Sequence, residues 1–353
     1  MSMYVINLLL LHDIYKSLFG IEKEHNPDAK LHHSFKIFYM QQNPFIFMQL
    51  KDLGERKIIE ILAKHFEIEA LDDCATIPFH DSFFLITTDM VNEKTHFPEG
   101  TTPYHIGWFS VAVNLSDVAA KGGKPLGMVL SIGMPKDKDI DFIKEFARGA
   151  MECAQRFDMP ILGGDTKEMD SITICGTAFG IVKQKEFMSR YGMKVGDIVC
   201  VTGELGRAGY ALSSTKKRKS MFDELLLITP RVNEGRSMAS LKVVTSSMDI
   251  SDGLAASLYQ LSELNDKGFI IYMKKIPIAK ESDKEHALYS GGDYELLFTI
   301  PRKKIMVAKQ KLKSMGCNLT EIGEVIEEKK VLLIENEKEM IMENKGYEHF
   351  MEK

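Results

Sequence analysis

The segment Met248-Asp249-Ile250-Ser251-Asp252-Gly253-Leu254 gives the clearest indication of fold in this chain of 353 residues. Residues 243–250 have the composition of a β-strand, and residues 254–264 repeat apolar side chains at helical spacing. Asp252 and Gly253 lie between the two, where a helix would begin. A strand that leads directly into a helix is typical of α/β proteins.

Strands and helices continue to alternate on both sides of this segment. Further strands are predicted at residues 83–88, 127–133, 171–182, 198–202, 269–273, 295–300 and 331–334. Other helices are predicted from Leu53, from Thr102 as N-cap with Pro103 as first helical residue, at 139–157 and at 302–315. A fresh apolar run follows Gly196-Asp197. We therefore expect a mixed α/β (α+β) fold with two domains, residues 48–190 and 191–353.

Residues 1–47 differ in style from the rest, with a small apolar face followed by a polar stretch and an irregular aromatic stretch. We expect an N-terminal extension there, either a peripheral appendage or the product of an upstream start. Neither alternative places chemistry in this segment.

Composition excludes several classes of protein. The formal charge of −5 gives no broad basic field for nucleic acid. The five cysteines lie far apart without a Cys-x-x-Cys pair, so a zinc or redox centre is not expected. No apolar run approaches the roughly 20 residues that span a bilayer. We expect a cytoplasmic protein that associates with neither membranes nor nucleic acid.

Short aspartate motifs recur beside apolar runs and glycines. They occur at residues 71–75, 87–89, 114–117, 163–166 and 248–253. A buried carboxylate without a partner is costly, and a shared cation would relieve that cost. Mg²⁺ prefers oxygen ligands and is commonly held by a few carboxylates together with substrate phosphates. The motifs therefore favour magnesium-dependent phosphate chemistry.

Each motif also has a plain structural alternative. Asp72-Asp73, which precedes a predicted turn containing Pro78, could be an acidic loop, and in an extended segment only one of the two would point inward. The motif at 87–89 could simply end a strand, and Asp117 could be a buried helical kink. Gly163-Gly164 predicts a tight turn that exposes Asp165 and lets phosphate approach the backbone. Asp252 could be an ordinary N-cap.

Taken in order, the motifs resemble thiamine-monophosphate kinase, within the superfamily of aminoimidazole ribonucleotide synthetase. The resemblance spans about Met48 to Phe350 and includes His96-Phe97, residues 112–117 and the closing Gly346-Tyr347-Glu348-His349-Phe350. It implies ATP-dependent phosphorylation of thiamine monophosphate, which gives thiamine diphosphate and ADP. It also implies a two-domain subunit whose N-terminal sheet pairs into a barrel across a homodimer.

The resemblance implies a role for particular residues. Several Mg²⁺ ions would be held by Asp73, Thr87, Thr88, Asp89, Asp117, Asp165, Asp249 and Asp252. ATP would be contacted by Arg190, Ser251 and Gly164. The substrate would lie near His96, Tyr347 and Asp293. Transfer between two anions depends on positioning and neutralisation more than on a strong base, so direct in-line transfer is expected and no general base is assigned.

One departure from the family pattern affects substrate recognition. Family members commonly have Gly-Gly-Glu-Asp-Tyr-Glu-Leu, whereas this chain has Gly292 in place of the glutamate. In the family that acid helps to bind substrate, and Asp293 or a water could replace it. Two alternatives stay open. One is a sister ATP-dependent enzyme that acts on another phosphate or nucleotide, and the other is a non-catalytic protein that binds ATP or thiamine phosphate.

Overall fold

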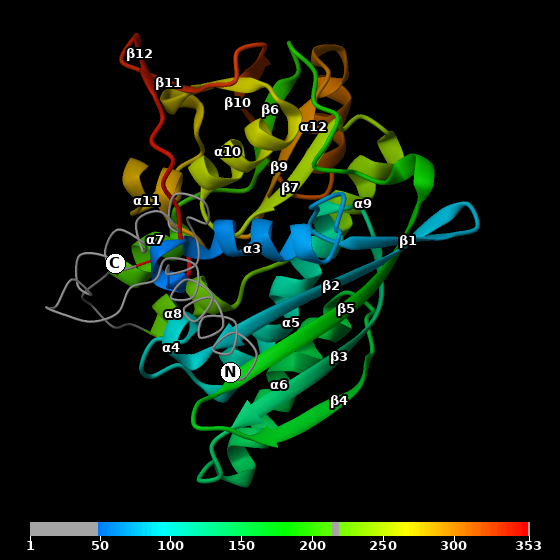
Figure 1. Ribbon diagram of the computed structural model, residues 1–353, viewed down its shortest axis with the longest axis vertical. Coiled ribbons are helices and arrows are strands. Elements are labelled where there is room, and N and C mark those ends of the chain that lie inside the picture. Colours follow the sequence, from blue (N-terminus) through cyan, green and yellow to red (C-terminus); the bar gives the residue numbers. More distant parts are fainter. Residues whose placement is uncertain (1–48, 214–218, 352–353) are drawn as a thin grey trace, which may run out of the picture. The chain divides into compact units, whose positions relative to one another are not determined.

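The computed structural model describes residues 49–213 and 219–351 (Figure 1). The chain divides into two units, the first made of residues 1–62 with 349–353 and the second of residues 63–348. In the first unit, the described part contains η1 (Leu50–Asp52) and the start of α3 (Gly54–His65). The predicted extension at residues 1–47 lies outside the described residues. All the structure discussed below belongs to the second unit.

The first sheet of this unit has five strands in the order β1-β2-β5-β3-β4. The strands are β1 (Ala75–Phe79), β2 (Ser82–Asn92), β3 (Lys124–Met134), β4 (Ile161–Glu168) and β5 (Thr173–Lys183). Only β3 and β4 run parallel to each other. Figure 1 shows α5 (Pro103–Ala120) and α6 (Ile140–Arg156) together on one face of this sheet.

The second sheet has seven strands in the order β12-β11-β8-β10-β6-β9-β7. They are β6 (Ile198–Thr202), β7 (Ser246–Ile250), β8 (Gly268–Tyr272), β9 (Glu295–Ile300), β10 (Leu319–Ile326), β11 (Val331–Glu335) and β12 (Lys338–Ile341). The pair β8 and β11 is parallel, and the other pairs are antiparallel. The predicted mixed α/β fold is confirmed.

Further helices connect and cover these strands. They are α4 (Glu93–His96), α7 (Arg207–Ser213), α8 (Lys219–Leu226), α9 (Val232–Leu241), α10 (Leu254–Asn265), α11 (Lys284–Tyr289), α12 (Ile305–Lys313) and the short 3₁₀ helices η2 (Gln184–Glu186), η3 (Met273–Lys275) and η4 (Arg302–Lys304). Among the described helices, none is long and apolar enough to cross a membrane.

Helix α5 is the central element for the site because nearly all of it is buried. Its predicted N-cap is confirmed, since the side chain of Thr102 accepts from the backbone N–H of His105. It packs closely against α6, where a Cβ on Gly107 would lie 2.0 Å from the carbonyl oxygen of Phe146. Trp108 Nε1 donates to Ile228 O at 2.8 Å. An apolar helix held on several sides can keep polar side chains at defined internal positions.

Two local predictions were wrong. Residues 163 and 164 do not form a turn but continue β4, because glycine accepts the φ angles of +152° and +159° that the strand has there. A Cβ on Gly164 would collide with Leu130 O at 1.8 Å, so close pairing with β3 requires glycine. Residues 75–79, which we expected to contain a turn at Pro78, form the exposed strand β1 at the edge of the sheet, where proline is tolerated.

Candidate functional site

Three carboxylates from separate parts of the chain converge. Asp73 lies in the bend before β1, Asp117 lies on α5 and Asp249 lies on β7. Each offers one oxygen, and these oxygens lie within 4.8 Å of one another. We call Asp73, Asp117 and Asp249 the acidic triad. The side chains of Asp73 and Asp249 are buried, and that of Asp117 is half-buried.

Hydroxyl and amide groups orient the triad and its surroundings. Thr87 on β2 donates a short hydrogen bond to Asp117 Oδ2, and Ser116 on α5 donates to Asp249 Oδ2 at 2.6 Å. Asn114 Oδ1 accepts from the backbone N–H of Asp89 at 3.2 Å, which joins α5 to β2. The polar residues that interrupt the apolar pattern of α5 therefore serve this site.

The charges of these carboxylates are poorly neutralised by the chain itself. Burial, together with Asp89, Asp249 and Asp73, raises the pKa of Asp117 well above its usual range. Burial, followed by the charge of Asp73, raises the pKa of Asp249 to about 7. Burial, with Asp73 and Asp252, raises the pKa of Asp89 to about 6. These five carboxylates repel one another, and a cation would relieve that repulsion.

Basic groups contact both carboxylate oxygens of Asp73. Arg190 Nε donates to Asp73 Oδ1 at 2.8 Å, and Lys121 Nζ lies 2.7 Å from Asp73 Oδ2. Although burial opposes it, the charges of Arg190 and Lys121 lower the pKa of Asp73. Asp72 accepts from Lys121 Nζ, from Ser189 Oγ and from Arg190 N. We call Asp72, Asp73, Lys121 and Arg190 the basic–acidic network.

This network corrects the expectation that one carboxylate of Asp72-Asp73 points inward and the other outward. Both carboxylates bind partners inside the protein because residues 72–73 precede β1 and a bend covers residues 73–74, so strand alternation does not apply. Only Asp73 contributes to the acidic triad.

The acidic triad fits a divalent cation. Its donors are carboxylate oxygens, which hard cations prefer, and Asp73 Oδ2 is buried with Lys121 Nζ as its ion-pair partner at 2.7 Å. The raised pKa values of Asp117 and Asp249 indicate negative charge that the chain leaves uncompensated.

Two predicted metal ligands lie away from the triad. Thr88 points to the face of β2 opposite Thr87, is exposed, and donates to Gly176 O at 2.8 Å. Asp165 is exposed on β4, pairs in register with Ser131, and is outside the triad. Gly164 lies beside it in the same strand. Thr88, Asp165 and Gly164 could therefore bind a metal ion or ATP only where that ligand reaches the exposed parts of β2 and β4.

Two of the predicted ATP and substrate residues, Ser251 and Tyr347, lie at or beside the end of β7. Gly292 N donates to Ser251 O at 2.7 Å, and Tyr347 N donates to Asp252 O at 2.9 Å. Gly253 is the N-cap of α10 and has φ +104°, a backbone conformation that favours glycine. The chain from Ser251 to Gly253 therefore touches both the loop that contains Gly292 and the segment that contains Tyr347.

Aromatic rings extend from this loop to His96. The rings of Tyr294 and Phe109 meet edge to face at 5.7 Å, and those of Phe109 and His96 are 6.2 Å apart. Tyr294 has φ +51°, a strained conformation for a tyrosine. Burial, followed by the nearby aspartates, raises its pKa well above the usual range, so its hydroxyl stays protonated.

Asp293, the predicted substitute for the missing family acid, is already engaged. It accepts from the backbone N–H groups of Gly206 at 2.6 Å and Ala208 at 3.2 Å. Burial raises its pKa to about 6, although these two hydrogen bonds oppose the shift. Gly292 and Asp293 line a pocket of about 200 Å³ with Arg156, Arg207, Glu224, Ile228, Thr229, Arg231 and Glu295.

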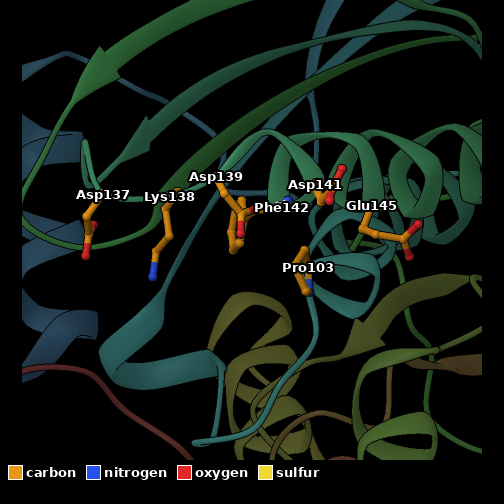
Figure 2. Close-up of a pocket in the computed structure, with 7 residues that line it drawn as sticks. All are labelled: Pro103, Asp137, Lys138, Asp139, Asp141, Phe142 and Glu145. Carbon is orange, nitrogen blue, oxygen red and sulfur yellow. Dashed lines mark hydrogen bonds between the residues drawn. The ribbon is translucent and has the colours of Figure 1, made fainter.

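Figure 2 shows a different pocket, of about 360 Å³, at the start of α6. Asp137, Asp139, Asp141 and Glu145 line it, with Pro103, Lys138 and Phe142. None of these residues belongs to the acidic triad, and Asp139 caps α6 by accepting from Phe142 N. This pocket supplies exposed carboxylates that serve below as controls.

Sequence reasoning missed Lys121 and Tyr294. A lysine at the end of a helix is usually a solvated cap, so its sequence position gave no sign of burial. Tyr294 follows Gly291-Gly292-Asp293, and that glycine pair was the available signal for an unusual backbone.

Comparisons with known proteins agree with this architecture. Residues 71–182 match the family described as AIR synthase related protein, N-terminal domain, and residues 194–335 match its C-terminal domain. The thiamine-monophosphate kinase of Methanospirillum hungatei is 38% identical over 302 residues, covering 84% of this chain and 99% of that protein. The enzyme of the same name from Aquifex aeolicus is 32% identical over 322 residues, covering 86% of this chain and 100% of that protein.

Solved structures give the same result. AaThiL complexed with AMPPCP and TMP superposes with a TM-score of 0.77 at 29% identity, covering 86% of this chain and 99% of that chain. The two domain matches together span most of the described structure, and the sequence relatives are covered along nearly their whole length. The chain therefore belongs to the thiamine-monophosphate kinases of the AIR synthase related family.

Proposed function

We propose that this kinase transfers the γ-phosphoryl group of ATP to the phosphate of thiamine monophosphate, giving thiamine diphosphate and ADP. The acidic triad is the observation that carries the proposal, because its three oxygens lie within 4.8 Å in a site with uncompensated negative charge. The names of the relatives and the ligands of AaThiL support the choice of substrates.

Mg²⁺ would be held by Asp73, Asp117 and Asp249, with Thr87, Asp89 and Asp252 beside them. When bound, it would neutralise the phosphate charges during transfer. The chain itself orients the carboxylates through Thr87 and Ser116 and keeps Asp73 ionised through Arg190. Thr88 and Asp165 remain predicted ligands, further along the exposed strands.

The remaining predicted residues have separate tasks. Arg190, Ser251 and Gly164 would contact ATP, and His96, Tyr347 and Asp293 would contact the acceptor. Two hydrogen bonds already fix Asp293, so it would act by position and not as a proton acceptor. We assign no general base, because the acceptor is an anionic phosphate and alignment dominates such transfers.

We also propose that the first sheet forms a homodimer contact. Exposed apolar side chains lie on its strands, with Phe79 on β1, Met90 on β2 and Leu162 on β4 all more than half exposed. Apolar groups on strands would be protected in a dimer. We further propose domains at residues 48–190 and 191–353, which is compatible with the two family matches.

The test is formation of thiamine diphosphate from thiamine monophosphate, ATP and Mg²⁺, followed by chromatography with and without chelator. We expect product only when free Mg²⁺ is present. If ATP binds but no thiamine diphosphate forms over a range of Mg²⁺ concentrations, the proposed acceptor is wrong.

A further inference from the structure

Lys121, at the C-terminal end of α5, is fully buried in the protein. Its Nζ lies 2.5 Å from Asp72 Oδ1 and 2.7 Å from Asp73 Oδ2, and it donates to Ser247 O at 2.9 Å. All three contacts involve oxygens, so each N–H of the ammonium group has an acceptor available. Its pKa is raised by Asp73 and Asp72 against the effect of burial, and it therefore remains charged.

The two carboxylates beside Lys121 differ in their other contacts. Asp72 binds Lys121, Ser189 Oγ and Arg190 N, and it does not contribute to the acidic triad. Asp73 binds Lys121 and Arg190 and also belongs to the triad. A change of charge at Lys121 or Asp72 therefore affects the proposed metal site in two ways, through its contact with Asp73 and through direct electrostatic interaction with the metal.

We propose that Lys121 is a positioning residue that sets the affinity of the acidic triad for a divalent cation. It pairs with Asp73 Oδ2 and supplies a fixed positive charge close to the proposed metal. The inference rests on the metal site of the proposed function. It goes beyond that function by assigning part of the site's charge balance to a buried ammonium group.

The charge balance gives the sign of the effect. In the basic–acidic network, Lys121 and Arg190 offset Asp72 and Asp73. Replacing Lys121 by methionine leaves one net negative charge and removes a cation that repels the metal. Replacing Asp72 by asparagine does the reverse, because Lys121 is then less neutralised. At separations of a few ångströms these charges interact strongly even under substantial screening.

The experiment is titration of nucleotide-free protein with Mn²⁺ alone, using electron paramagnetic resonance to count free Mn²⁺, together with the Mn²⁺-induced change in melting temperature. We expect Lys121→Met to bind Mn²⁺ about tenfold more tightly than the wild type and Asp72→Asn about tenfold more weakly. The double variant Lys121→Met/Asp72→Asn should return close to wild-type affinity. Lys124→Met, which removes an exposed lysine from β3, should not change the affinity.

A purely structural role for Lys121 predicts a different pattern. Lys121→Met would then lower the melting temperature and leave Mn²⁺ affinity unchanged or weaker, and that result overturns the inference. If Lys121→Met does not fold, Asp72→Asn decides, because an affinity equal to wild type contradicts the charge argument. If the wild type binds no Mn²⁺, both the proposed metal site and this inference fail. Wild-type binding without the opposite shifts overturns the inference alone.

Discussion

The two sides of the acidic site differ in what neutralises their carboxylates. On one side, Asp73 meets Arg190 and Lys121, and its pKa is lowered. On the other side, Asp117 and Asp249 accept hydrogen bonds from the hydroxyl groups of Thr87 and Ser116, and burial and other acids raise their pKa values, although the charge of Arg190 opposes the shift at Asp249. The charge of Asp73 is therefore neutralised within the chain, whereas Asp117 and Asp249 leave negative charge that a bound cation can neutralise. The contrast shows that Arg190 and Lys121 stabilise the site, whereas Asp117 and Asp249 are the carboxylates left to bind a cation.

The largest effect is expected where no basic group assists. Asp117→Asn should lower kcat/KM by at least about a hundredfold, because it removes a charge aimed at the proposed metal. It should not lower the melting temperature of metal-free protein, since it relieves repulsion among buried acids. The assay follows thiamine diphosphate, and melting is measured in chelator.

Asp137→Asn is the matched control for this variant. Asp137 is an exposed acid in the pocket of Figure 2, so its replacement should change neither activity nor stability. Normal turnover by Asp117→Asn would show that the triad is not the reacting site. A large loss of stability would show that the charge deficit has been misjudged.

The neutralised side should respond in the opposite way. Arg190→Met leaves Asp73 with less compensation in a buried position, and it should lower the free energy of unfolding by about 3 kcal/mol. Denaturant unfolding measures this change. Arg148→Met is the control, because Arg148 pairs with Glu145 and Glu152 on an exposed face of α6 and should contribute little. If Arg190→Met and Arg148→Met have the same free energy of unfolding, Asp73 does not need Arg190 for neutralisation, and the two sides of the acidic site do not differ in this respect.

The pH dependence of metal-free protein sharpens the comparison further. The pKa of Asp249 is about 7 in the folded protein against 3.8 for an ordinary aspartate, so between these values the folded state holds a proton that the unfolded state has lost. The free energy of unfolding should therefore fall as pH rises from about 4 to about 7. One such group contributes at most about 1.4 kcal/mol per pH unit.

Asp249→Asn provides the test of this assignment. Its unfolding free energy should decline less steeply over that range than that of the wild type, when both are measured by denaturant titration in chelator. Identical slopes would mean that Asp249 is already ionised in the folded protein without metal.

Local pattern predicted much of the fold. The strands β6 and β9 were predicted with their observed bounds, and α5 with its N-cap, because apolar runs, Thr102-Pro103 and the glycines after α5 act locally. The helices α7, α8 and α9 were not predicted. Nothing local required β4 to continue through Gly163 and Gly164, since that depends on pairing with β3.

The candidate site was predicted as a set of aspartates but not as an arrangement. The sequence placed Asp73, Asp117 and Asp249 in separate motifs, and only the fold brings their oxygens together. Lys121 could not be predicted, because its burial depends on Asp72, which is 49 residues away. Hydrophobic periodicity and local motifs carry no information about ion pairs between residues so far apart in the sequence.

The smallest expected effect concerns Gly292, where this chain departs from the family pattern. Gly292 has φ +102°, and an added Cβ would lie 2.8 Å from the Cβ of Ala208. Gly292→Ala and Gly292→Glu should therefore each cost about 1 kcal/mol of unfolding free energy from backbone strain. A loss of unfolding free energy that is equal in the two variants would come from backbone strain alone.

Substrate affinity should then separate the two variants. The resemblance implies that a glutamate at this position helps to bind substrate, so Gly292→Glu should lower the KM for thiamine monophosphate a few-fold while Gly292→Ala leaves it unchanged. Steady-state kinetics at saturating ATP measures both. Equal KM values would mean that the pocket beside Asp293 does not meet the acceptor. If only the glutamate variant has a lower KM, the acceptor lies beside the loop that contains Gly292. The backbone of this loop binds Ser251, so the acceptor would then lie next to the side of the site whose carboxylates lack compensating charge.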